Sequence, residues 1–163
     1  MKNIISLKHI LVAVIMMATI YTANAQSSAE VEKAVKEIVS RYDGKDKVTC
    51  LTVAKGSGLD LVKAMFNKEF GRSFMKGVKS ITMIEYSDAS QETCAALRKE
   101  MDVFLSMLQE FDLSEEKNFS DNDFIRCFAS VSEGDTTLSD FVIAMEDKDT
   151  KVLMYMSGTI KVE

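Results

Sequence analysis

Gly56-Ser57-Gly58 lies between an expected strand and an expected helix, where a phosphate group could bind at the N-terminus of the helix. The dinucleotide-binding fingerprint G-x-G-x-x-G requires a third glycine at position 61, which is leucine in this chain. The phosphate-binding P-loop requires Gly-Lys followed by Ser or Thr, and the sequence contains no such tripeptide. We therefore interpret this segment as a flexible turn that leads into a capped helix.

Carboxylates gather in two segments of the chain. They are Glu115, Glu116, Asp121 and Asp123 before an expected strand, and Asp147 and Asp149 in an expected turn. Pairs of carboxylates can hydrolyse glycosides, and loops rich in acids can bind calcium. Neither segment fits the calcium-binding loop that begins D-x-[DN]-x-[DN]-G, so we expect solvated loop acids in both places.

Three cysteines follow the first 25 residues, namely Cys50, Cys94 and Cys127. An odd number cannot be fully paired within one chain, and the spacing offers no CxxC redox motif or zinc knuckle. Each cysteine lies within an apolar pattern, which favours buried free thiols. One disulfide between Cys50 and Cys127, both in expected strands, is the alternative.

Thioether sulfur could bind copper, and methionine is abundant. The methionines beyond the first 25 residues are Met65, Met75, Met83, Met101, Met107, Met145, Met154 and Met156. Met154 and Met156 alternate on one face of an expected strand, and Met101 lies on an apolar helix stripe. This spacing predicts filling of the core rather than a metal site.

The first 25 residues have the features of a secretory signal peptide. Lys2 and Lys8 supply its positive charge, residues 10–20 carry no charge, and Ala23-Asn24-Ala25 fits the recognition site of signal peptidase. We expect cleavage after Ala25, with residues 26–163 forming a single domain in the periplasm or outside the cell. Retention of the segment as a membrane anchor is the alternative.

Cleavage would change what the protein can do chemically. The only histidine, His9, lies in the removed segment, so histidine bases and histidine metal sites are excluded from the mature chain. Removing 25 of the 163 residues leaves 138, and losing Lys2 and Lys8 changes the formal charge from −5 to −7. This acidic balance argues against binding to nucleic acid or anionic lipid. We assign no catalytic, cofactor-binding or metal-binding residue and expect no cofactor.

The apolar spacing predicts three helices followed by a strand-rich end. The expected helices cover residues 31–42, 59–70 and about 90–111, and the expected strands cover 47–54, 80–86, 123–131, 137–146 and 151–162. The order α-β-α-β-α-β-β-β indicates an α+β fold with one mixed or antiparallel sheet of about five strands and helices packed on one face.

The last expected strand alternates most clearly. Val152, Met154, Met156, Ile160 and Val162 share one face, which we expect to lie on the core. Tyr155 and Lys161 lie on the opposite face, which we expect to meet water unless another layer or a partner covers it.

Several features together resemble a known family. They are the signal peptide, the strand sequence Val48-Thr49-Cys50-Leu51-Thr52-Val53, the strand sequence Ser80-Ile81-Thr82-Met83-Ile84, a long helix and three closing strands that end in Met156-Ser157-Gly158-Thr159-Ile160. This pattern, from Lys47 to the C-terminus, resembles domain of unknown function family 4252, or a sibling family, of the Bacteroidota. The resemblance implies export, an α+β fold and no assigned activity, and it supplies no catalytic residue.

The sequence therefore favours a non-catalytic binding or interaction module of the periplasm or cell envelope. Its partner would be an unknown envelope protein or a small ligand, without nucleic acid and without stable membrane insertion after cleavage. One alternative is a carboxylate-based or Ser/Lys-based hydrolase that uses the loop from Glu115 to Asp123. Another is a thiol or copper stress protein, which would need two of the three cysteines close together or exposed.

Overall fold

The structure is a computed structural model that describes residues 28–70, 73–111, 125–131 and 137–161. In this part of the chain the helices are α2 (Ser28–Tyr42), α3 (Ser57–Phe70) and α4 (Gln91–Leu105). The strands are β1 (Thr49–Val53), β2 (Gly77–Glu85), β3 (Gln109–Phe111), β4 (Ile125–Val131), β5 (Thr137–Glu146) and β6 (Lys151–Lys161). The signal peptide and the predicted cleavage site lie outside the described residues.

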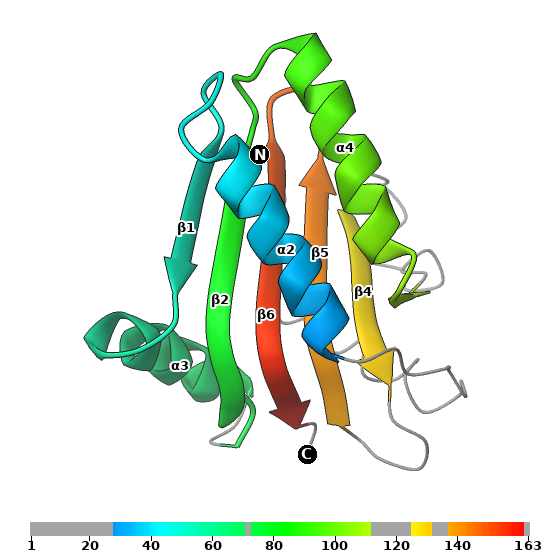
Figure 1. Cartoon of the computed structure of the whole chain (residues 1–163). Coiled ribbons are helices and arrows are strands. Elements are labelled where there is room, and N and C mark those ends of the chain that lie inside the picture. Colours follow the sequence, from blue (N-terminus) through cyan, green and yellow to red (C-terminus); the bar gives the residue numbers. More distant parts are fainter. Residues whose placement is uncertain (1–27, 71–72, 112–124, 132–136, 162–163) are drawn as a thin grey trace.

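One antiparallel sheet organises the fold, with strand order β1-β2-β6-β5-β4-β3 (Figure 1). The closing meander β4, β5 and β6 is paired in sequence, and β2 joins it by pairing with β6. The predicted α+β fold class is confirmed, although the sheet has six strands rather than about five. The predicted third helix ends at Leu105 instead of near residue 111, and β3 supplies the additional strand.

Helices α2 and α4 lie side by side across one face of this sheet (Figure 1). Helix α4 begins after Ser90, whose side-chain oxygen accepts a hydrogen bond from the Thr93 backbone N–H, as an N-cap residue does. The stripe predicted for this helix is buried, and it consists of Cys94, Leu97, Met101, Phe104, Leu105 and Leu108. Together with Val31, Val35 and Ile38 of α2, it packs against Ile84, Phe128, Val142, Leu153 and Tyr155 of the sheet.

The other face of the sheet carries a second apolar cluster. It includes Ile81, Cys127, Phe141, Ile143, Met156 and Ile160, and Met154 packs against it. Helix α3 contributes Leu59 and Val62 to this cluster, so it belongs to the opposite side from α2 and α4. The sequence predicted that the helices pack on one face of the sheet. Among the described residues, α2 and α4 do so, whereas α3 packs against the other face.

The prediction for the two faces of β6 was half right. Met154, Met156 and Ile160 do share a face, but Tyr155 is 1% exposed and lies beneath the helix layer. Alternation showed that the two faces of β6 differ, whereas the packing of α2 and α4 made both of them interior. The side chain of Lys161 lies outside the described residues.

Strand pairing is interrupted at one level across four strands. The register shifts between Val78 and Ser80, between Ser139 and Phe141, and between Phe128 and Ser130. Asp140 has φ 52 and Gly158 has φ 95 at this level, both in the left-handed region. Such bulges bend strands and increase their twist, and Figure 1 shows β2 and β6 curving in their lower halves.

Candidate functional site

The three cysteines are free, and Cys50 and Cys127 lie on opposite faces of the sheet. Cys50 on β1 packs with the cluster under α2 and α4, whereas Cys127 on β4 belongs to the cluster on the other face. Three strands separate β1 from β4, so the two cysteines are roughly 19 Å apart at a strand spacing of about 4.8 Å. A disulfide needs Cα atoms within about 7 Å, so the alternative pairing of Cys50 with Cys127 is wrong.

We expect the native thiols to react slowly with a thiol reagent at mildly alkaline pH. Burial raises the pKa of Cys50 to about 11 and that of Cys127 to about 12, and Cys94 is buried. Little reactive thiolate is therefore present. Labelling with Ellman's reagent should show slow reaction in buffer and three fast thiols in concentrated urea. Two fast thiols in the native protein would instead favour the thiol stress reading.

The acidic segments divide between described and undescribed parts of the chain. Glu115, Glu116, Asp121 and Asp123 lie outside the described residues. In the turn after β5, an oxygen of Asp147 accepts hydrogen bonds from the backbone N–H groups of Asp149 and Thr150, each at 2.7 Å, which gives that carboxylate a role in shaping the turn. Within the described ranges, no group of three or more His, Cys, Asp or Glu residues could hold a metal ion.

The segment Gly56-Ser57-Gly58 forms a turn at the start of α3. Gly56 has φ 85, which favours glycine, and a Cβ added to Gly58 would lie 3.3 Å from Cγ1 of Val53. Its glycines therefore serve the turn and the close approach of α3 to β1, as we interpreted from the sequence. No helix in the described part of the chain is long and apolar enough to cross a membrane.

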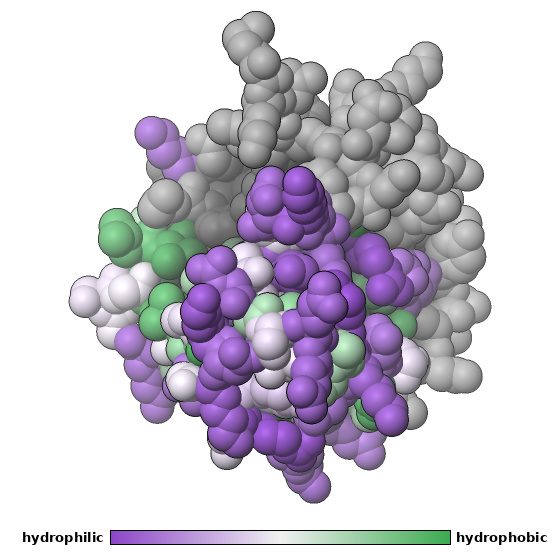
Figure 2. All heavy atoms as spheres, turned by 90° about the horizontal axis from the view of Figure 1, so that it is seen from above, coloured by the Kyte–Doolittle hydropathy of each residue, from purple (hydrophilic) through white to green (hydrophobic). Residues whose placement is uncertain are grey.

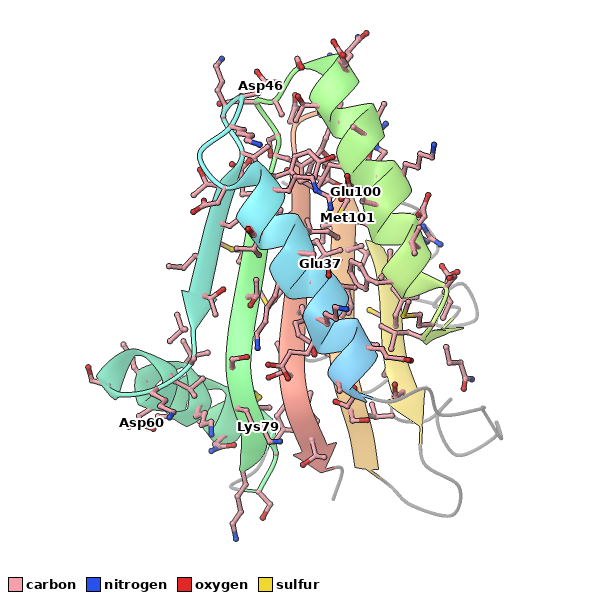
Figure 3. All side chains as sticks on the ribbon, viewed as in Figure 1. Glu37, Asp46, Asp60, Lys79, Glu100 and Met101 are labelled. Carbon is pink, nitrogen blue, oxygen red and sulfur yellow. The ribbon has the colours of Figure 1, made fainter. Side chains whose placement is uncertain are left out.

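A shallow hollow runs along the outer side of α2, and its charged lining is internally paired. Glu32 pairs with Lys36 and Lys33 with Glu37 along the helix. Arg41 pairs with Glu100 of α4 at 2.6 Å, and Figure 3 shows Glu100 directed toward α2. All three are ordinary surface ion pairs, two within α2 and one between α2 and α4, so the charged groups that line the hollow are already paired with one another or with Glu100.

Asp140 is the most unusual titratable residue that the structure describes. It is 0% exposed and stands at the β5 bulge with φ 52. One carboxylate oxygen accepts hydrogen bonds from Tyr155 Oη at 2.7 Å and from Ser28 Oγ at 3.0 Å. The other oxygen, Oδ2, is buried without a hydrogen-bond partner among the described atoms. Asp140 thereby ties the first residue of α2 to the centre of the sheet.

Burial raises the pKa of the Asp140 carboxyl, and it outweighs the hydrogen bonds from Tyr155 and Ser28, which act to lower it. Nearby charges act in both directions, because Glu32 raises the pKa and Lys79 lowers it. The aspartate therefore favours its neutral form more than a solvated aspartate does. The site is sealed beneath α2, which gives a substrate no access to this carboxyl in the described structure.

We expect Asp140→Asn to flatten the pH dependence of stability. Above the ordinary pKa of 3.8, the folded protein holds the Asp140 proton more tightly than the unfolded chain does, so stability falls as pH rises toward the folded pKa. Asparagine does not titrate and tolerates a positive φ, so this loss should disappear. Urea unfolding from acidic to neutral pH measures the effect.

Tyr155→Phe provides the matched comparison for that experiment. It removes a hydrogen bond that lowers the pKa of Asp140, so the variant should lose more stability than the wild type as pH rises. Parallel pH profiles for the wild type and Asp140→Asn would contradict the assignment of the raised pKa to this residue.

The free edge of β1 is the candidate functional site. The Cys50 backbone N–H donates to Asp43 at 2.9 Å, so it points away from β2, and the alternation of an antiparallel pair makes Thr52 point the same way. The other side of β2 gives the same alternation independently. The Tyr86 N–H donates to the Lys151 carbonyl, so Tyr86, Ile84 and Thr82 direct their backbone groups toward β6. Their partners in β1, which include Thr52, must then direct theirs away from β2. Thr52 thus presents its backbone N–H and C=O to solvent.

The upper part of this edge is closed by the loop that follows α2. Gly44 donates to the Val48 carbonyl at 3.1 Å, Val48 donates to the Lys45 carbonyl at 2.8 Å, and Asp43 occupies the Cys50 N–H. The edge is therefore open only from the carbonyl of Cys50 onward. Capping and short length are common protections of edge strands, and here they leave one residue, Thr52, with both groups free.

Two large apolar side chains are exposed on β1 and on α3, the helix that follows it. Leu51 on β1 is 53% exposed and Leu61 on α3 is 64% exposed. Figure 2 shows hydrophobic residues at the side of the molecule where β1 and α3 lie, next to a surface that is otherwise largely hydrophilic. An unpaired strand edge next to exposed apolar side chains is the arrangement that strand-adding partners use.

Sequence reasoning missed both Asp140 and the open edge of β1. Asp140 had a visible signal, since it is the one acid within the apolar run of residues 138–145. The edge of β1 had no such signal, because the strand order of the sheet, and hence which strand lies at its edge, cannot be derived from this sequence alone.

Comparisons with known proteins add a family and no activity. Neither curated proteins nor solved structures give a significant match to this chain. A family model described as a domain of unknown function, DUF4252, matches residues 42–163, which include every described strand and helices α3 and α4. The resemblance drawn from the strand and helix pattern is thus confirmed, and the chain belongs to the DUF4252 family.

Proposed function

We propose that this protein is an exported, non-catalytic binding module that acts in the periplasm or outside the cell after cleavage behind Ala25. The features of the first 25 residues support export. The binding role rests on one observation, the open edge of β1 at Thr52 beside the exposed Leu51. The partner would be an envelope protein that contributes an extended segment.

Strand addition suits this edge because the groups it offers are backbone groups. A partner strand would form hydrogen bonds with the N–H and C=O of Thr52, and its side chains would alternate between the two faces of the sheet. On one face they would meet Leu51, which is already half exposed, and on the other Thr52, whose Oγ1 lies 3.0 Å from Oγ1 of Thr82.

Thr52→Pro tests the proposal without breaking the pairing of β1 with β2. Proline removes the outward N–H, and it is tolerated on edge strands whose N–H faces solvent. The matched control is Thr52→Val, which loses the side-chain hydroxyl but keeps the backbone N–H and a branched side chain suited to strands.

The experiment is a crosslinking pull-down of mature protein, residues 26–163, from the source envelope, with bound proteins identified by mass spectrometry. We expect one partner to be retained by the wild type and by Thr52→Val and lost with Thr52→Pro. Equal recovery with Thr52→Pro and wild type would show that binding does not use the β1 edge. Intact-mass measurement of exported protein tests the cleavage, and a mass that still includes residues 1–25 would contradict it.

A further inference from the structure

We propose that the strand added to β1 is β1 of a second copy of this chain, so that two sheets join edge to edge around a two-fold axis. This inference rests on the proposed function, because it names the partner of the same edge. It follows from which backbone groups are free, from the side chains that would face each other and from the charges at the two ends of the strand.

The free backbone groups select one register. In an antiparallel pair, residues that point outward on one strand must face residues that point outward on the other. Facing Cys50 with Cys50 or with Thr52 would require the Cys50 N–H, which Asp43 already occupies. Facing Thr52 with Thr52 of the second copy puts at the centre the one residue of β1 whose outward N–H and C=O are both free, and it forms two symmetric hydrogen bonds. In the flanking pair of Cys50 with Ala54 of the second copy, only the Cys50 carbonyl is free to accept, because Asp43 keeps the Cys50 N–H.

The side chains are compatible with themselves in this register. Thr52 would face Thr52 of the second copy on the helix side of the sheet, and Thr–Thr cross-strand pairs are favourable. Because Thr52 already contacts Thr82 through their hydroxyl oxygens, a row of four threonines would cross the joint. On the opposite face Leu51 of each copy would lie against Val53 of the other copy. Two half-exposed leucines would therefore each gain an apolar neighbour.

The charges complement each other by the same symmetry. Asp43 is held at Cys50, and this register places Cys50 opposite Ala54 of the second copy. Lys55, which is exposed, is the next residue of that second copy. One carboxylate and one ammonium group would therefore approach each other at both ends of the joint, although each copy is acidic as a whole.

The joint is short, so we expect a dimer that dissociates on dilution rather than an obligate one. Sedimentation equilibrium of mature protein over a wide concentration range measures its dissociation constant. Thr52→Pro removes the hydrogen-bond donor from both central bonds and should weaken the dimer about tenfold or more. Thr52→Val keeps both backbone donors and loses only the side-chain hydroxyls, so it should weaken the dimer less than Thr52→Pro does. Lys55→Glu should weaken it, whereas Lys47→Glu, at the closed end of the edge, should not.

Disulfide trapping reports the register directly. In a Cys50→Ala background, Thr52→Cys would place two thiols opposite each other, with Cα atoms about 5.5 Å apart, within the range for a disulfide. Mild oxidation should then give a crosslinked dimer on non-reducing gels. Lys47→Cys is the control, because its two copies would lie ten residue steps apart, roughly 33 Å, and should not crosslink.

The outcomes separate this inference from the proposed function. A dilution-sensitive dimer that Thr52→Pro weakens and Thr52→Cys traps supports the second copy as the partner. A strict monomer that still captures an envelope protein in a Thr52-dependent way overturns the dimer and leaves the binding module in place. A dimer that is indifferent to Thr52→Pro overturns this use of the edge, and a monomer without Thr52-dependent capture overturns both proposals.

Discussion

Replacing Tyr155 by alanine is expected to lower the free energy of unfolding by about 3–5 kcal/mol, as for other large aromatic side chains removed from a core. Tyr155 is 1% exposed and packs between the sheet and the layer of α2 and α4. Its hydroxyl also donates to Asp140 at 2.7 Å, so alanine would leave a cavity and take one partner from a buried carboxyl. Urea unfolding followed by circular dichroism measures the change.

Two variants divide this effect into its parts. Tyr155→Phe keeps the ring and loses the hydrogen bond, so it should lower the stability by about 1–3 kcal/mol. Met156→Ala, on the opposite face at 1% exposure, should lower it by about 2–5 kcal/mol, and the partly buried Met154→Ala should have a smaller effect. If Tyr155→Ala unfolded at the wild-type midpoint, the helix layer would not cover β6 as described.

Gly158→Ala is expected to lower the free energy of unfolding by about 2–5 kcal/mol, from backbone strain and from overpacking. Gly158 has φ 95, and a Cβ added to it would lie 2.2 Å from the carbonyl oxygen of Gly77 and 3.0 Å from the backbone nitrogen of Lys79. Both contacts are backbone atoms of β2, so relief requires the paired strands to move apart at the bulge. Urea unfolding again gives the magnitude.

Gly44→Ala is the matched control for backbone strain alone. Gly44 has φ 72, but a Cβ added there would have no neighbour within 4 Å. It should therefore lose only about 1–2 kcal/mol, the strain of a left-handed residue. Equal losses for the two variants would show that the close approach of β2 and β6 at Gly158 has no energetic consequence.

The elements that depend on local patterns were predictable from the sequence. The apolar stripe predicted from Cys94 to Leu108 is buried along α4 and the turn after it, and Ser90 caps α4, because helix period and capping are properties of neighbouring residues. The alternation in β6 likewise predicted that Met154 and Met156 share a face. The fold class and the family followed from the order of these elements. The end of α4 was predicted too late, since pairing of residues 109–111 with β4 competed with continued helix.

Tertiary structure alone decided how these elements are covered and which of them lies at an edge. Period two shows that the faces of a strand differ, but whether Tyr155 meets water or a helix depends on where α2 and α4 dock. Cys50 and Cys127 looked equivalent as strand cysteines, yet strand order places three strands between them and puts their side chains on opposite faces. The open edge at Thr52 has the same origin. A strand becomes an edge only through the pairing of segments distant in sequence, and β1 is left unpaired on one side because β6 takes the place beside β2.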